Sequence, residues 1–166
     1  MTNKFTIGTI VKNHFGVLNR VAGLFAKRCY NIYSLAVGET ENPEFSRITI
    51  VVEGDDYVKD QIMKQLLKLH DVVSAMLLED ENAVLREHML VKLGIKDGKY
   101  AELSDLINRY GGKMIDFSAT TVTAEFAGYE NPNTVFLEKV AKEFEILEVC
   151  RAGMIALAKG AETIKE

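Results

Sequence analysis

The chain has 166 residues, of which 48% are hydrophobic and 27% charged, as expected for a globular protein with one domain or two small ones. Its formal net charge of −4 argues against a nucleic-acid partner held through phosphate contacts. No apolar run approaches the length of a membrane span, and the N-terminal residues lack the apolar segment of a signal peptide, so we expect a cytoplasmic protein. The only cysteines are Cys29 and Cys150, and we expect both to be reduced and structural.

The first half of the chain alternates between residue patterns of strands and helices. Apolar residues at every second position predict strands, and apolar residues at three- and four-residue spacing predict helices. Cys29 continues the first apolar helical stripe and is therefore expected in the core. The predicted elements are a strand over 5–11, a helix over 17–29, strands over 32–38 and 46–53, a helix capped by residues 54–56 and running to 69, and a strand over 72–78.

The second half repeats this order. An acidic, polar segment over 79–82 is expected to be a linker. Asn131 followed by Pro132 predicts an N-cap and the first helical residue, and the pair Gly111-Gly112 predicts a helix end. The predicted elements are a strand over 89–95, a helix over 103–110, strands over 113–118 and 122–127, a helix from 131 to 144, and one long strand over 146–157, bent at Gly153.

The order β-α-β-β-α-β, found twice, predicts an α+β protein with two ferredoxin-like domains. We expect an N-terminal domain over residues 1–79, a C-terminal domain over 84–160 and a charged, loose tail over 161–166. Three apolar residues, Ile10, Ala36 and Val51, lie out of phase with the core-facing positions. Pairing of sheets or edges between chains, giving at least a dimer, would cover them; burial within one chain is the alternative.

The junction between the first strand and the first helix carries the most informative residues. Asn13 and Gly16 lie there, and Asn31 follows the helix. A helix N-terminus has unpaired backbone N–H groups and a partial positive charge that suit a carboxylate, and a glycine lets a ligand approach the backbone. The two carboxamides can donate and accept hydrogen bonds. This combination indicates a pocket for a small zwitterion, although Gly16 alone would also fit a simple tight turn.

Segments from both halves resemble one family. They are Asn13-x-x-Gly16-Val17-Leu18-x-Arg20-Val21-x-Gly23-Leu24-Phe25, Tyr30-Asn31-Ile32-x-Ser34-Leu35, Ser46-Arg47-x-Thr49-Ile50, Gln65-Leu66-x-Lys68-Leu69-x-Asp71-Val72, Arg86-Glu87, Ile115-Asp116-Phe117 and Arg151-Ala152-Gly153. Together they resemble the small regulatory subunit of acetolactate synthase (acetohydroxyacid synthase), whose N-terminal part is an ACT domain. The likeness extends to about Gly160.

The resemblance implies a site for a branched-chain amino acid, usually valine, that acts as feedback inhibitor. It implies that Gly16, Val17 and Leu18 offer N–H groups to the ligand carboxylate and that Asn13 orients the ligand. Asn31, with Ile32 beside it, would reach the ligand from a neighbouring subunit of a homodimer. The sequence departs from the usual residues at His14-Phe15 and at Tyr33, near this site.

The resemblance also implies a partner, the large catalytic subunit, which condenses two pyruvates to 2-acetolactate with thiamine diphosphate, a divalent metal (Mg) and FAD. No cofactor is expected on this chain. The alternative is a stand-alone ACT-type sensor that regulates a different enzyme. An RNA-binding module of the same fold is disfavoured by the acidic composition and by the lack of aromatic residues over 46–53.

Catalysis has little support in the sequence. The histidines His14, His70 and His88 are scattered, and no nucleophile, phosphate-loop or dinucleotide motif is present. His14 is expected to be an exposed loop residue. Gly23, inside a predicted helix, is expected to allow close helix packing. For Arg47, contact with a partner subunit and a solvated surface charge are left as alternatives.

Overall fold

The computed structural model describes residues 3–79, 81–95 and 98–165. The chain forms two compact units: Met1–Leu85 with Met154–Glu166 make unit 1, and Arg86–Gly153 make unit 2. The expected limits of the two domains, at residues 79 to 84 and at 160, differ from this division mainly at the C-terminus. Residues 154–160 belong to unit 1 because the last strand packs there, as described below.

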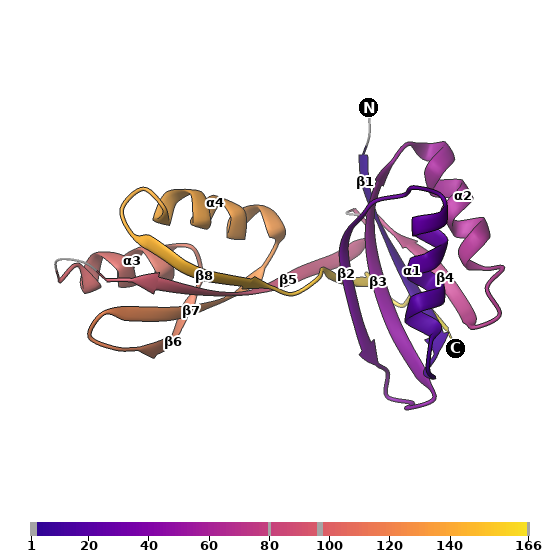
Figure 1. The fold of residues 1–166 in the computed structure, drawn as a ribbon, viewed down its shortest axis with the longest axis horizontal. Coiled ribbons are helices and arrows are strands. Elements are labelled where there is room, and N and C mark those ends of the chain that lie inside the picture. Colours follow the sequence, from indigo (N-terminus) through magenta and orange to yellow (C-terminus); the bar gives the residue numbers. More distant parts are fainter. Residues whose placement is uncertain (1–2, 80, 96–97, 166) are drawn as a thin grey trace. The chain divides into compact units, whose positions relative to one another are not determined.

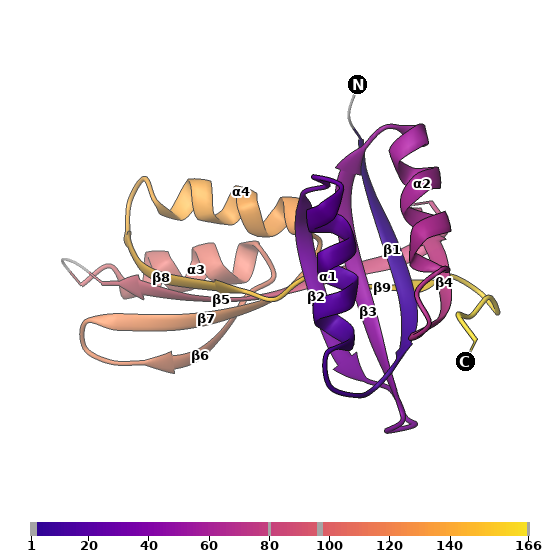
Figure 2. The ribbon, with the colours of Figure 1, turned by 45° about the vertical axis from the view of Figure 1, so that its right-hand side comes forward.

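Unit 1 contains a four-stranded antiparallel sheet with the strand order β2-β3-β1-β4. Figures 1 and 2 show α1 and α2 on the same face of this sheet. The predicted β-α-β-β-α-β order is confirmed. The elements are β1 (Asn3–Lys12), α1 (Val17–Lys27), β2 (Ile32–Glu39), β3 (Phe45–Gly54), α2 (Asp56–Leu66) and β4 (Val72–Leu78).

The core of unit 1 lies between this sheet and its two helices. Strand positions that share a face in the register, such as Ile7 opposite Ile50, are fully buried, and so is Phe25 of α1. Burial of each such side chain stabilises the fold by about 1.5–3 kcal/mol. The predicted cap of α2 is confirmed, because the Asp55 carboxylate accepts a hydrogen bond from the Val58 N–H at 2.8 Å.

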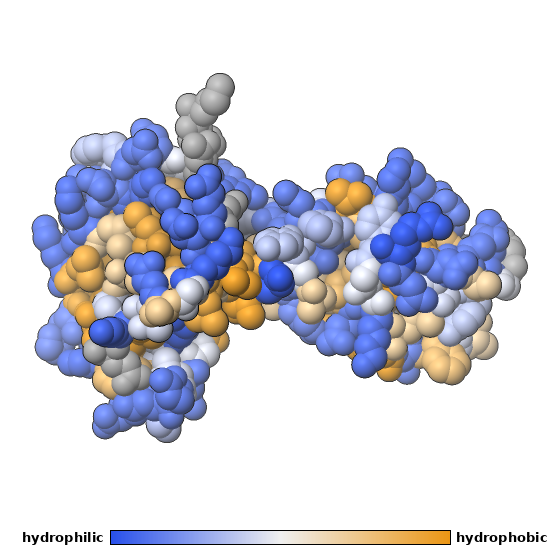
Figure 3. Space-filling view, turned by 180° about the vertical axis from the view of Figure 1, so that it is seen from behind, coloured by the Kyte–Doolittle hydropathy of each residue, from blue (hydrophilic) through white to orange (hydrophobic). Residues whose placement is uncertain are grey.

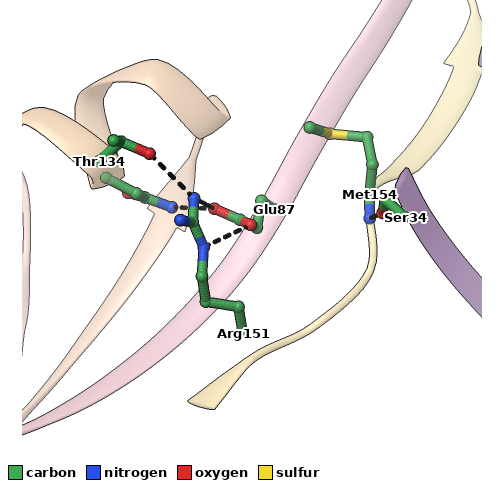
Figure 4. A network of polar contacts seen from close by, with 6 residues as sticks. Ser34, Glu87, Thr134, Arg151 and Met154 are labelled. Carbon is green, nitrogen blue, oxygen red and sulfur yellow. Dashed lines mark hydrogen bonds and ion pairs between the residues drawn. The ribbon is translucent and has the colours of Figure 1, made fainter. Parts of the chain in front are cut away.

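The other face of this sheet is covered by the end of the chain. The expected single strand over 146–157 is wrong: it is divided into β8 (Glu145–Arg151) and β9 (Ile155–Ala158), and β9 pairs with β5 (Ala83–Gly94). Val51 packs there in a second cluster with Leu85, Met154 and Ala156. Two polar contacts fasten this segment: the Met154 N–H donates to Ser34 Oγ at 2.7 Å (Figure 4), and Arg47 Nη2 donates to the Ala156 carbonyl at 2.8 Å.

This packing revises three expectations. Val51 and Ile10 are 6% and 3% exposed within one chain, so they need no second copy to bury them. Arg47 is not a fully solvated charge: it is half-buried, and burial lowers the pKa of its guanidinium. The tail, expected to be loose, contacts β1 and β4: a Cβ on Gly8 would lie 2.6 Å from Ile164, and Ser74 Oγ donates to the Lys165 carbonyl.

Apolar side chains nevertheless remain exposed on unit 1. They include Tyr33 and Val37 on the edge strand β2 and Ile155 and Leu157 on β9. Figure 3 shows apolar surface on this unit in the view from behind. An exposed edge strand with apolar side chains is a surface that proteins usually cover by pairing.

Unit 2 repeats the architecture, with the strand order β6-β7-β5-β8 and a core between the sheet and its helices. Met89, Val91 and Leu93 of β5 face this core, as predicted from their alternation. No helix in the described ranges has the length and apolar character needed to cross a membrane. The remaining elements are α3 (Tyr100–Arg109), β6 (Lys113–Phe117), β7 (Thr121–Gly128) and α4 (Glu130–Val140).

Two expectations about helix and linker limits are wrong. The helix α4 begins at Glu130 after Tyr129, so Asn131 and Pro132 lie inside its first turn and no side chain caps it. Where a linker over 79–82 was expected, Glu79 and Asn82 belong to unit 1, and the Asn82 N–H donates to the Glu79 carbonyl at 2.9 Å. Asp80 of this segment lies outside the described residues.

A polar network fastens α4 to the sheet of unit 2 (Figure 4). Glu87, which is 7% exposed, accepts hydrogen bonds from Arg151 Nε at 2.8 Å and Nη2 at 2.7 Å, and from Asn133 Nδ2 at 3.1 Å. Arg151 also donates to Thr134 Oγ1 at 3.2 Å. No buried side-chain nitrogen or oxygen in the described part of the chain lacks a hydrogen-bond partner. The network thus joins β5, β8 and the first turn of α4.

The end of α1 is unusual because Cys29 adopts a left-handed backbone conformation, with φ of 57°. The Tyr30 N–H donates to the Phe25 carbonyl and the Cys29 N–H to the Ala26 carbonyl, which is the hydrogen-bond pattern of a Schellman motif. Glycine usually occupies this position, because a Cβ is strained there. Cys29 is an exposed, free cysteine, so the expectation of a core residue is wrong.

Replacing Cys29 by glycine is expected to raise the free energy of unfolding of unit 1 by about 0.5–1 kcal/mol, because it removes this strain. Urea unfolding followed by circular dichroism measures it. Gly111 provides the matched control: it ends α3 in the same motif, with φ of 75°, and a Cβ there would meet no atom within 4 Å. The variant Gly111→Ala should therefore lose about 1 kcal/mol. Equal unfolding of Cys29→Gly and wild type would contradict the assignment of strain.

Candidate functional site

The loop between β1 and α1, residues 13–16, forms the centre of the predicted site. Gly16 occupies the N-cap position with φ of 86°, a conformation that favours glycine, and no side chain caps the helix. Among the described residues, none accepts a hydrogen bond from the backbone N–H of Gly16 or Leu18, while the Val17 N–H makes a long contact of 3.4 Å with the His14 carbonyl. The helix N-terminus therefore retains donors for an anion.

Asn13 is fixed by the hairpin between β2 and β3. Its side-chain Nδ2 donates to Glu39 Oε1 at 3.0 Å and to the Pro43 carbonyl at 2.9 Å, and its backbone N–H donates to the Glu44 carbonyl at 2.7 Å. Both amide hydrogens are used in this way, so the side chain presents Oδ1 as an acceptor. The sequence indicated Asn13 but not its hydrogen-bond partners, because the loop over 39–44 was expected only to be a solvated hairpin.

Asp71, just before β4, holds the other side of the loop. Its carboxylate accepts a 2.6 Å hydrogen bond from Arg20 Nε and lies 3.0 Å from His14 Nε2. Burial alone would raise the pKa of Asp71, but the hydrogen bond and charge of Arg20, followed by those of His14, outweigh it and lower this pKa. The expectation for His14 holds only in part: its side chain is 49% exposed but is anchored by Asp71.

Two further side chains shape the surroundings of the loop. A Cβ on Gly16 would lie 3.6 Å from Arg20 Nη1, so a guanidinium stands beside the helix N-terminus and adds positive charge there. Phe15 is fully exposed.

The sequence also departs from the usual family residues at Tyr33, on β2. The Tyr33 side chain is 45% exposed, and Lys4 Nζ lies 3.2 Å from the centroid of its ring.

The structure does not bring all predicted site residues together within one chain. Gly16, Val17 and Leu18 lie at the start of α1, whereas Asn31 and Ile32 follow its end. The 11 residues of α1 span about 16 Å. Asn31 is exposed and Ile32 is half-buried against the core. The two groups of predicted site residues thus lie at opposite ends of one helix.

The anchoring of the loop predicts a pH dependence. Because the pKa of Asp71 is lower in the folded chain than in the unfolded chain, its stabilising contribution is complete above the ordinary pKa of an aspartate, near 4, and is lost as the pH falls through the lowered value. Replacing Asp71 by asparagine should therefore lower the free energy of unfolding of unit 1 at pH 7 and make it less sensitive to acid below pH 5. Urea unfolding at pH 7, 4 and 3 measures both effects, with Glu41→Gln in the exposed hairpin as control.

The groups at this loop are suited to bind and orient an anion. It offers backbone N–H groups, a carboxamide oxygen and an arginine beside a loop, and the described ranges contain no group of three or more His, Cys, Asp or Glu side chains placed to hold a metal ion. A β-α-β-β-α-β sheet with such a helix N-terminus defines an ACT-type ligand-binding module.

Comparisons with known proteins identify the family. A family model described as the AHAS small subunit-like ACT domain matches residues 7–74, and one described as the small subunit of acetolactate synthase matches residues 86–160. The chain belongs to the family of acetolactate synthase small subunits.

Individual relatives align with nearly the whole length of this chain. A probable acetolactate synthase small subunit of Archaeoglobus fulgidus is 39% identical, over 95% of this chain and 98% of its own length. The acetolactate synthase small subunit of Mycobacterium bovis is 38% identical, over 96% and 94%. The crystal structure of the Thermotoga maritima small subunit superposes with a TM-score of 0.89 at 34% identity, covering 96% of this chain and 99% of that one. The two-domain α+β fold is thereby confirmed.

Proposed function

We propose that this chain binds a branched-chain amino acid, valine first among them, and thereby regulates the large catalytic subunit of acetolactate synthase. The observation that carries the proposal is the helix N-terminus at Gly16, whose unused N–H groups lie next to the fixed Asn13. The N–H groups of Gly16 and Leu18 bind the ligand carboxylate, helped by the nearby charge of Arg20. Asn13 Oδ1 accepts a hydrogen bond from the ligand ammonium group, because its amide hydrogens already serve Glu39 and Pro43.

The site is completed by a second copy of the chain in this proposal. Asn31 and Ile32 lie at the far end of α1 from Gly16, so they reach a ligand only if two copies meet with these ends together. The edge strand β2, with Tyr33 and Val37 exposed, and the exposed Phe15 supply apolar surface for such a homodimer. Ile32 and its neighbours then form the apolar wall for the ligand side chain.

The proposed regulation depends on a difference in ligand affinity between two arrangements of the complex. The unliganded small subunit raises the activity of the catalytic subunit, and the amino acid shifts the complex toward a less active arrangement. A ligand shifts such an equilibrium only by its difference in affinity for the two states, typically 1–3 kcal/mol. The thiamine diphosphate, divalent metal and flavin of the reaction are assigned to the catalytic subunit, with none on this chain.

Two titrations test the proposal. Isothermal titration calorimetry of the purified chain with valine, leucine and isoleucine, and with serine as control, should show saturable binding of a branched-chain amino acid. An activity titration of the reconstituted holoenzyme should show activation by this chain and inhibition by the same amino acid. Absence of binding both to the chain and to the holoenzyme would refute the effector site, and absence of activation would refute the regulatory role.

A further inference from the structure

A groove of about 550 Å³ lies between α1 and the end of α2, on the helical side of unit 1. Figures 1 and 2 show these helices side by side. Four cationic side chains line the groove, and its lining contains no acidic residue; we call it the basic groove. The cations are Arg20, Lys27, Arg28 and Lys68.

The charge of the basic groove is largely uncompensated. Arg20 pairs with Asp71, but in the described part of the chain no carboxylate lies within 4.0 Å of Lys27, Arg28 or Lys68. This concentration of positive charge occurs on a chain whose net charge is −4. The end of α1 accounts for part of it, since cations near a helix C-terminus interact favourably with the dipole. Lys68 comes from another element and adds to the same groove.

Gly23 provides an independent observation. It lies in the middle of α1 and lines the groove, yet a Cβ placed on it would meet no atom within 4 Å. The expectation that Gly23 permits close packing inside the chain is therefore wrong. A glycine in a helix interior costs about 1 kcal/mol relative to alanine, and no contact among the described residues explains it. The space above Gly23 allows another backbone to approach α1 closely.

The floor of the groove is apolar. Leu24 and Leu69 line it and are half-buried, between cations that are themselves exposed. From Arg20 to Arg28 the groove follows about 12 Å of helix. A small anion would need cations that converge on one point, whereas an apolar floor with cations spread along its length fits the apolar stripe and acidic flanks of a peptide helix.

We propose that the basic groove is the docking surface for an acidic, amphipathic segment of the large catalytic subunit, an inference that rests on the proposed function. The apolar face of that segment contacts Leu24 and Leu69, its backbone passes over Gly23, and its carboxylates pair with Lys27, Arg28 and Lys68. Complementary charge accelerates association and makes it sensitive to salt. The groove begins at Arg20, which also stands beside the effector loop, so the segment and the amino acid contact the same helix.

The test measures association of the full-length chain with the purified catalytic subunit at 50 and 300 mM salt. The triple variant Lys27→Glu/Arg28→Glu/Lys68→Glu should weaken association at least tenfold at low salt and lose most of the salt dependence. The matched control reverses three exposed lysines of unit 2, in Lys113→Glu/Lys139→Glu/Lys142→Glu, and should stay within about twofold of wild type. Equal losses in the two triple variants would overturn the assignment.

A second variant tests the groove without changing its charge. Gly23→Leu adds an apolar side chain to the groove at a position where a Cβ meets no described atom within 4 Å. It should keep or raise the melting temperature while weakening association at least tenfold. Wild-type affinity in both Gly23→Leu and the basic-groove triple variant would overturn the proposal. So would binding of inorganic triphosphate that the triple variant loses while its association with the catalytic subunit is unchanged.

Valine binding separates this inference from the proposed function. Each variant is first titrated with valine, and only those that bind it like wild type are compared for association. Wild type that binds valine but does not associate with the catalytic subunit refutes the regulatory function and the docking surface together. Wild type that associates, with variants that associate equally well, refutes the docking surface alone.

Discussion

Replacing Glu87 by alanine is expected to lower the free energy of unfolding of unit 2 by about 3 kcal/mol. The Glu87 carboxylate is buried and accepts two hydrogen bonds from Arg151 and one from Asn133. Its removal leaves a partly buried guanidinium without its carboxylate and a carboxamide, 3% exposed, without its acceptor. Breaking such a pair costs more than the pair itself contributes, because the remaining groups stay desolvated.

Urea unfolding followed by circular dichroism, with hydrogen exchange of α4 and β8, measures this loss. Glu125→Ala is the matched control, because Glu125 lies 2.7 Å from His88 Nε2 in an exposed pair on the same sheet and should cost less than about 1 kcal/mol. Glu87→Gln keeps the shape and an acceptor oxygen, so its loss should be intermediate. If Glu87→Ala and Glu125→Ala unfold at the same urea concentration, the network does not stabilise unit 2.

Replacing Asn13 by alanine is expected to weaken valine binding by about 10–150-fold while leaving activation of the catalytic subunit intact. The variant removes the acceptor for the ligand ammonium, and a hydrogen bond to a charged group contributes about 1.5–3 kcal/mol. It also removes the two hydrogen bonds that fix the loop to Glu39 and Pro43. Calorimetry with valine, and inhibition of the reconstituted holoenzyme, measure the two consequences separately.

Glu39→Gln distinguishes contact with the ligand from support of the loop. It weakens one hydrogen bond that positions Asn13 but leaves Asn13 Oδ1 in place, so the loss of affinity should be less than about fivefold. Asn108→Ala, on the exposed side of α3 in unit 2, should bind valine like wild type. Unchanged valine affinity in Asn13→Ala would show that this side chain does not contact the effector.

Local patterns in the sequence predicted most elements of both units. Alternation identified the core-facing residues of β1, β3 and β5, because successive strand residues point to opposite faces of a sheet. The apolar stripe of α1 and the cap at Asp55 are equally local features. Gly16 was recognisable for the same reason, because a glycine between a strand and a helix indicates a local backbone conformation that other residues rarely adopt. The family resemblance extended these patterns to an effector site and a partner.

Only the tertiary structure decided how distant segments meet. The division of 145–158 into β8 and β9 depends on the second face of the first sheet, which no neighbouring residue in the sequence reveals. Cys29 follows an apolar stripe and was expected in the core, but the Schellman motif turns the chain before it and leaves it exposed. Gly23 has the sequence signature of close packing, yet the space beside it is empty within this chain.

The residues that hold the candidate site in place could not be predicted from the sequence either. Asp71 anchors His14 and Arg20 from more than 50 residues away, and Glu39 occupies an amide hydrogen of Asn13 across the β2–β3 hairpin. The segments Arg86-Glu87 and Arg151-Ala152-Gly153 were both recognised in the sequence, but nothing there indicated that Glu87 and Arg151 pair. Residue type and spacing determine local conformation and the kind of group at each position. The partners of a charged or amide side chain depend on which strands become neighbours, and that is set by packing of the whole sheet.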